Sequence, residues 1–236
     1  MERFFKLKER GTTVKTEFVA GMTTFFSMVY ILMVNANMFA DPLGDGTNPL
    51  GVSYGAIYIA TAISAVLGTV LAGVLANLPL AQASGMGLYY LLGLTVGGFY
   101  ESLNITIVSP IEAFNEFRTQ SLFKVFTEGF DFSAFTDEHG AANLVLTILT
   151  TALAFCMVDM FDTLGTLFAA CERAGLVDEK GEPLNMNRGM LSDAIATTAG
   201  AICGTSTVTT FSEVNAGVAA GGRPVLPRYF AARSSL

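Results

Sequence analysis

Residues 204–218 of this chain read G-T-S-T-V-T-T-F-S-E-V-N-A-G-V, and this stretch decides the fold. Its Thr/Val run is β-branched and alternates as a short strand does. A lone acid, Glu213, and then Gly217 follow the run and suit the opening of a helix, while a small-residue helical pattern precedes it over residues 190–203. A hydrophobic element interrupted at a carboxylate is typical of membrane transporters, because irregular backbone survives in a bilayer only where it lines a cavity or is buried in protein.

The composition is that of a membrane protein. Of 236 residues, 52% are hydrophobic and only 14% are charged, with a mean hydropathy of +0.52, whereas soluble domains carry about 25% charged residues. The single histidine, His139, lies in a polar stretch and cannot build a metal site alone. The cysteines have no metal-like spacing and are expected to be free thiols in or beside apolar stretches: Cys156, Cys171 and Cys203. We therefore expect no metal and no cofactor.

Charge and hydropathy predict the first part of the topology. Residues 1–17 are basic and precede an apolar run over 18–40, so the positive-inside rule places the N-terminus in the cytoplasm. The loop 41–53 carries two acids and no Lys or Arg, which places it outside. Residues 54–78 form a second predicted span, rich in Ala and Gly.

A second interrupted element follows at residues 79–88, which read P-L-A-Q-A-S-G-M-G-L. Pro79, Gly85 and Gly87 break what would otherwise be a hydrophobic helix. One interpretation is a tight loop between helices, and the other is a binding site. The break at residue 204 favours the binding site, because transporters place broken helices in corresponding halves of an inverted repeat.

The next predicted span, residues 143–170, contains two acids three residues apart, Asp159 and Asp162, which fall on one helix face. A carboxylate at mid-span costs roughly 2.5–3.5 kcal/mol on insertion scales, so an intramembrane acid is a functional-site hypothesis by default. The alternative is that both acids are hydrated near the interface. An acidic stretch over 101–140 precedes this span and is predicted to be an outside loop, and the basic loop 171–188 is predicted to be cytoplasmic.

Several motifs closely resemble the azaguanine-like purine permeases of the nucleobase–cation symporter superfamily. They read V-D-M-F-D-T-L-G-T (158–166), L-S-D-A-I-A-T-T-A-G-A (191–201), G-T-S-T-V-T-T-F-S-E (204–213) and A-G-V-A-A-G-G-R (216–223), with residues 4–17 and 83–88 alike as well. The resemblance implies an all-α polytopic membrane protein with two inverted seven-segment repeats and two breaks where half-helices join short strands. It implies transport of adenine, guanine or hypoxanthine across the cell membrane.

The resemblance also implies a substrate site. Asp162 corresponds to the acid of the eighth segment and Glu213 to that of the tenth, and both are expected to bind the purine and to carry the coupled proton. The other expected substrate contacts lie at the two breaks: Gly85, Met86, Gly87, Thr207 and Thr209. The expected partners are a purine base, a coupling cation expected to be a proton, and the lipid bilayer. A second copy of the chain, in a homodimer, is a further candidate partner, and no nucleic acid is expected.

The chain departs from the family pattern in two places. Tyr89 and Tyr90 stand where the family has Asn-Ala, and we hypothesise an internal deletion near Leu88 that removed the rest of segment three through most of segment seven. After Arg223 the tail P-V-L-P-R-Y-F is unlike any span, and a one-base shift of frame would restore the family's T-G-L-T.

These departures define the expected organisation of the chain. Residues 1–88 hold two and a half spans, 89–143 hold the junction and the acidic loop, 144–223 hold segments eight to ten, and 224–236 form an out-of-frame tail. We therefore expect impaired transport. The alternatives are a permease remnant without activity and a membrane enzyme that uses the Asp159/Asp162 pair, although no further carboxylate or histidine completes a metal site there.

Overall fold

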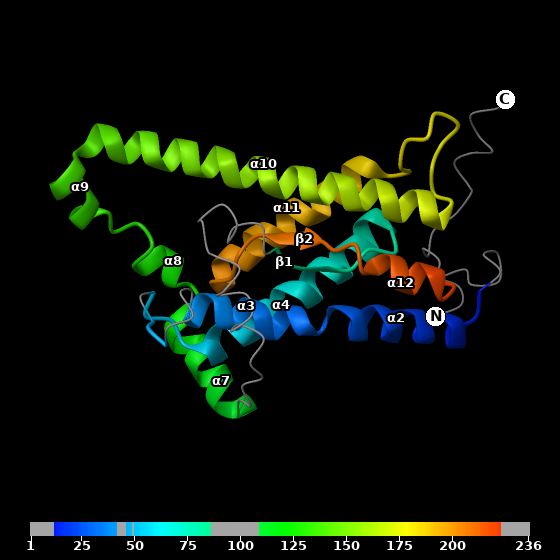
Figure 1. The fold of residues 1–236 in the computed structure, drawn as a ribbon, viewed down its shortest axis with the longest axis horizontal. Coiled ribbons are helices and arrows are strands. Elements are labelled where there is room, and N and C mark those ends of the chain that lie inside the picture. The colour runs from blue at the N-terminus through cyan, green and yellow to red at the C-terminus, as the bar shows by residue number, and fades with distance from the viewer. Residues whose placement is uncertain (1–11, 42–45, 49, 86–108, 223–236) are drawn as a thin grey trace.

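The computed structural model describes residues 12–41, 46–48, 50–85 and 109–222 (Figure 1). Helices dominate this part of the chain, and two three-residue strands interrupt them. In chain order the elements are α2 (Val14–Met28), α3 (Tyr30–Ala40), α4 (Tyr54–Leu71), the π-helix η2 (Ala72–Ala76), β1 (Gln82–Ser84), α7 (Pro110–Glu116), the π-helix η3 (Phe117–Ser121), α8 (Lys124–Thr127), α9 (Ser133–His139), α10 (Ala141–Ala174), α11 (Met186–Cys203), β2 (Val208–Thr210) and α12 (Val214–Ala219).

Three helical stretches within the described residues are long and apolar enough to cross a membrane. They are Val14–Ala40, Tyr54–Ala76 and Ala141–Ala174, with mean hydropathies of 1.6, 2.2 and 2.1. The prediction of an all-α polytopic membrane protein is therefore confirmed. The predicted segment 190–203 is a helix, α11, but it is not among these three because polar side chains such as Asp193 dilute its hydropathy.

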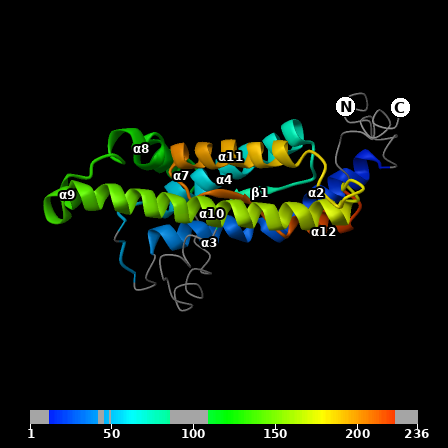
Figure 2. The ribbon, with the colours of Figure 1, turned by 90° about the horizontal axis from the view of Figure 1, so that it is seen from above.

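Both predicted breaks contain a strand, and the two strands pair. β1 and β2 are antiparallel, with Gln82 opposite Thr210 and Ser84 opposite Val208. The backbone amide of Gly85 extends the ladder by donating to the Thr207 carbonyl at 2.6 Å, and the amide of Phe211 donates to the Ala81 carbonyl at 3.3 Å. The pairing joins segments that lie more than a hundred residues apart, between α4 and α11 on one side and α10 on the other (Figures 1 and 2).

Local sequence signals explain where the helices begin and end. Thr13 caps α2, since its hydroxyl accepts from the amide of Thr16 at 3.2 Å, and Ser53 caps α4 in the same way through Ala56. α11 ends at Gly204, which adopts φ +83° and thus a left-handed conformation that suits glycine. After Gly204 the chain turns back beside the last turn of α11, and the Thr/Val run forms β2 there.

α4 and α11 pack closely, with small residues between them. Ala60 and Ala196 are fully buried, as are Thr61 and Ser64 on α4. Small side chains let two helix backbones approach, which is the common mode of association in membranes. α12 packs on α2 at a still closer approach, because a Cβ on Gly217 would lie 2.8 Å from the carbonyl oxygen of Ala20.

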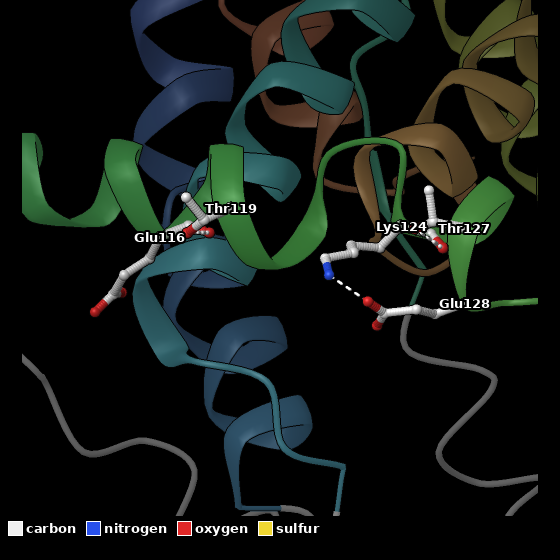
Figure 3. Close-up of polar contacts among 5 residues, drawn as sticks. All are labelled: Glu116, Thr119, Lys124, Thr127 and Glu128. Carbon is white, nitrogen blue, oxygen red and sulfur yellow. Dashed lines mark hydrogen bonds and ion pairs between the residues drawn. The ribbon is translucent and has the colours of Figure 1, made fainter.

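The acidic stretch before α10 differs from the predicted loop. Its described part, from residue 109, contains α7, η3, α8 and α9, and the first two pack against α4 through the buried residues Ala113 and Phe117. The Ser53 hydroxyl donates to Glu116 at 2.8 Å and ties this region to the start of α4. An ion pair between Lys124 and Glu128 lies on the exposed surface of α8 (Figure 3). Charge content alone missed these short helices because only a few of their residues pack against α4.

α10 is the longest helix, and only its second half is well covered. Thr163, Leu167, Ala170 and Cys171 are its buried residues, where they meet η2, the segment after it and α12. Figure 1 shows the first half of the helix extending beyond the other spans towards α9. No residue in the most apolar window of this helix is buried against the described part of the chain.

Candidate functional site

The two acids of α10 face the break between α11 and β2. Asp159 accepts a hydrogen bond from the Thr197 hydroxyl of α11 at 3.2 Å and a second from the side chain of Thr207, just before β2. The Thr197 hydroxyl also accepts from the Val208 amide at 3.1 Å and lies 2.9 Å from the Val208 carbonyl oxygen, so its single proton is shared between that oxygen and Asp159. The acid, the helix and the strand are thus fixed relative to one another.

The second acid of α10 lies at the strand itself. Asp162 accepts a side-chain hydrogen bond from Thr209. Thr209 is only 2% exposed, and its hydroxyl is 2.9 Å from that of Thr163, the residue after the acid. Thr207 and Thr209 are two positions apart, so an extended backbone presents both side chains to α10. Asp162 itself remains solvent-accessible from its outer side.

Glu213 enters the same neighbourhood from the start of α12, where it is the N-cap residue. The Tyr30 hydroxyl of α3 donates to one carboxylate oxygen at 2.9 Å, and the Ser212 hydroxyl donates to the other at 3.2 Å. Glu213 and Asp162 are close enough for their charges to repel. The structure therefore brings together the two acids that the motifs singled out, one from α10 and one from the second break.

A fourth acid, Asp193 of α11, belongs to this cluster and was not predicted as a site residue. It is 3% exposed, accepts from the Gln82 amide of β1 at 2.9 Å, and accepts a side-chain hydrogen bond from Thr163. The charges of Asp159 and Asp162 both act on it. The signal was present in L-S-D-A (191–194), because a lone acid among small residues is as costly there as in α10.

Two buried oxygens at the cluster have no hydrogen-bond partner among the residues described. They are Oδ1 of Asp159 and Oε1 of Gln82. Buried polar atoms are normally paired, and orphaned ones require an explanation. The orphaned carboxylate oxygen of Asp159 gives the cluster a free acceptor beside β2.

The arrangement provides hydrogen-bond acceptors rather than a metal cage. Within the described ranges, no group of three or more His, Cys, Asp and Glu side chains is arranged to hold a metal ion. Four carboxylates, two threonine hydroxyls and the edge of a two-stranded ladder instead converge from α10, α11, β2 and α12. Such a set can bind a neutral, flat molecule that carries N–H donors.

The other predicted contacts lie at the first break. Gly85 directly follows β1 and pairs with Thr207, as described above, and a Cβ at this position would lie 3.0 Å from the Thr209 methyl group. Met86 and Gly87 lie outside the described residues, as do Tyr89 and Tyr90. The two breaks thus meet at Gly85 and Thr207.

Comparison with known proteins shows that this chain is similar to permeases. The sequence model of a permease family matches residues 110–225. A guanine/hypoxanthine permease of Bacillus subtilis, PbuO, is 28% identical over 93% of this chain and 73% of its own length. An adenine permease of Escherichia coli, AdeQ, is 26% identical over 94% and 71%. A putative permease of Methanocaldococcus jannaschii is 27% identical over 94% and 72%.

The three long apolar helices and these matches support an integral membrane protein, and the relatives are permeases and not enzymes. The chain is related to the purine nucleobase permeases, which confirms the resemblance carried by its motifs. The alternative of a membrane enzyme built on Asp159 and Asp162 has no counterpart among these relatives.

The alignments also carry information on the length of the chain. The match to the archaeal permease extends over 325 positions but includes only 94% of 236 residues, or about 222. About a hundred aligned positions of that relative therefore have no counterpart here.

Proposed function

We propose that this chain binds a purine nucleobase between α10, the paired strands and the start of α12, as part of nucleobase transport across the membrane. One observation carries the proposal: Asp162 and Glu213 are charge neighbours although a basic loop, α11 and β2 separate them in the sequence. The names of the relatives, which include adenine and guanine/hypoxanthine permeases, supply the class of substrate.

The chemistry of a purine fits the cluster. A purine presents ring N–H donors and ring nitrogen or carbonyl acceptors in one plane. The carboxylates of Asp162 and Glu213 accept from N–H groups, and charge-assisted hydrogen bonds of this kind are the stronger ones. The hydroxyls of Thr207 and Thr209 can donate to ring acceptors. Met86 and Gly87, which follow Gly85, are proposed as further contacts.

The same acids serve coupling in this proposal. A carboxylate in a membrane-embedded site can take up a proton on one side and release it on the other, so Asp162 and Glu213 are proposed to carry the coupling proton. The protein is proposed to reside in the plasma membrane with its N-terminus in the cytoplasm, because residues 1–17 are basic. A homodimer is compatible with the exposed apolar surface of α10.

We further propose that transport by this chain is impaired. The hundred or so aligned positions without a counterpart support an internal deletion, and the hypothesised junction near Leu88 falls outside the described residues. The tail after Arg223, including the proposed change of frame, also falls outside them, and the family match ends at residue 225. An inactive remnant is the second candidate, favoured by the uncovered first half of α10.

Binding and transport are tested separately. Binding of radiolabelled hypoxanthine, guanine and adenine is measured on the full chain in lipid nanodiscs, and uptake is measured in a host that lacks purine transporters. We expect Asp162→Asn and Glu213→Gln each to abolish binding, because each removes a charged acceptor. Glu179→Gln, in the exposed loop after α10, serves as the matched control.

The uptake experiment compares this chain with a version restored to the length of its relatives. We expect the restored chain to take up purine and this chain to take up much less. Normal binding by both acid variants would contradict the proposed site. Binding without uptake in either version would leave the site standing and contradict transport.

A further inference from the structure

Asn35 of α3 is a polar residue in the last third of a candidate membrane span, Val14–Ala40, and it is completely buried. Its side chain hydrogen-bonds to α4 and to the segment that precedes β2. The amide nitrogen donates to the Thr61 hydroxyl of α4 at 2.7 Å and to the Thr205 hydroxyl at 3.0 Å, while the amide oxygen accepts from the Ser206 hydroxyl at 3.3 Å. One side chain therefore links two spans to the segment that precedes β2.

The first break joins the same network. The Ser84 hydroxyl, at the end of β1, is 2.8 Å from that of Thr205, and the Ser206 hydroxyl lies 3.2 Å from the Gly85 carbonyl oxygen, so its single proton is shared between that oxygen and the Asn35 amide oxygen. We call these five side chains the hydroxyl clasp: Asn35, Thr61, Ser84, Thr205 and Ser206. All five are buried. The clasp lies at the end of the strand pair that is formed by the last residue of β1 and the first residue of β2.

The available protons fix the orientation of the Asn35 amide. The Thr61 hydroxyl donates its only proton to the Ile57 carbonyl at 2.7 Å, so it can only accept from residue 35. This requires the nitrogen of the amide, and not its oxygen, to face Thr61. The oxygen then faces Ser206, which carries a proton to donate. No shorter or apolar side chain can supply two donors and one acceptor at this place.

The position of the clasp relates it to the purine site without touching it. Thr207 follows Ser206 directly and bonds Asp159, and Thr209 lies two residues further along the strand beside Asp162. A shift of the chain at Thr205 moves both hydroxyls away from the acids of α10.

We propose that Asn35 is a positioning residue, which holds the paired strands against α3 and α4 and thereby sets the purine site. The expected effect on purine binding rests on the proposed function, whereas the hydrogen-bond network itself does not. In the membrane the network replaces water as the partner of these buried groups, so losing its central amide removes hydrogen bonds to Thr61, Thr205 and Ser206 that lipid cannot replace.

The test replaces Asn35 with leucine, which is similar in size and cannot hydrogen-bond. Hydrogen exchange of the full chain is measured in nanodiscs by mass spectrometry, together with purine binding. We expect amide exchange at residues 82–85 and 205–210 to become about tenfold faster, as the loss of roughly 1.4 kcal/mol of local stability requires. We expect purine affinity to fall by a similar factor. Asn115→Leu, on the exposed side of α7, is the matched control and should change neither.

The two readouts separate this proposal from the proposed function. Hydrogen exchange is measured without purine. It therefore tests the role of Asn35 in the clasp even if the parent chain binds no purine and the proposed function fails. Unchanged exchange in Asn35→Leu would overturn the proposal, and so would faster exchange with full purine affinity. If Asn35→Leu does not insert, Thr205→Val makes the same test. Where both fold, the double variant should lose little more than either single variant, because both act through one network.

Discussion

Two regions of the membrane-embedded part behave in opposite ways. Around the strand pair, α3, α4 and α11 meet through small and polar residues that are almost fully enclosed, such as Asn35, Thr61 and Ala196. α10 instead presents an outer face of large apolar side chains that are 40–62% exposed: Leu153, Met157, Phe161 and Phe168. The breaks are therefore held by protein contacts, whereas the helix that carries two of the acids depends on surroundings beyond the described residues.

The difference shows which parts of the membrane-embedded region are held by contacts within the described residues and which are not. Backbone polar groups at the breaks must be satisfied by protein, because lipid offers them nothing. They are satisfied here by β1, β2 and the clasp. The outer face of α10 consists of apolar side chains that need no hydrogen-bond partner. Lipid or further protein segments can therefore cover it equally well. The hundred aligned positions of the archaeal relative without a counterpart here are our proposed source of such segments.

The largest expected effect in the packed region concerns Gly217 of α12. A Cβ there would lie 2.0 Å from the Thr24 hydroxyl oxygen and 2.8 Å from the Ala20 carbonyl oxygen, both on α2. Because backbone must move to admit a methyl group, we expect Gly217→Ala to lower the free energy of unfolding by about 1–3 kcal/mol. The measurement is the unfolding midpoint in detergent micelles.

Gly21→Ala is the control for that experiment, since it also adds a methyl group to α2 but meets nothing within 4 Å. An equal loss of stability in both variants would mean that the methyl group acts through the helix itself and not through the contact between α12 and α2.

A second variant probes the contact between β1 and α11. Gln82→Leu removes the amide that donates to the buried Asp193 carboxylate at 2.9 Å. An acid left without its donor costs about 1–3 kcal/mol, so we expect a loss in that range. The double variant Gln82→Leu/Asp193→Leu should recover part of it, because replacing both partners leaves nothing unsatisfied. A Gln82→Leu variant as stable as the parent would show that the carboxylate finds another partner.

Much of this organisation could be predicted from the sequence, and the reason is physical. Glycine, proline and a β-branched run act locally, so β2 and the start of α12 followed from residues 204–218 and a break followed from residues 79–88, whereas the strand within that break was implied by the resemblance. Long apolar runs likewise predicted three spans. The resemblance of the motifs supplied the pairing of Asp162 with Glu213, which no spacing could have given.

The parts that were missed depend on contacts between distant segments. Asn35 received no role from the sequence, because its partners Thr205 and Ser206 lie 170 and 171 positions away. Asp193 was part of a quoted motif but received no role, because only the fold brings it to Gln82. The helices α7 and α8 were missed because their packing on α4 and α11 rests on a few side chains.

The smallest expected effect lies on α10 and has the opposite sign to that of Gly217. Gly165 continues the outer face, four residues after Phe161, and a Cβ there meets nothing within 4 Å. Glycine in a helix interior is less stable than alanine by roughly 0.5–1 kcal/mol, so we expect Gly165→Ala to raise the unfolding midpoint in micelles. The same substitution tests what covers the helix in the membrane. If Gly165→Ala stabilises this chain but destabilises the length-restored version, a restored segment packs on this face; if it stabilises both, the face is turned to lipid in both.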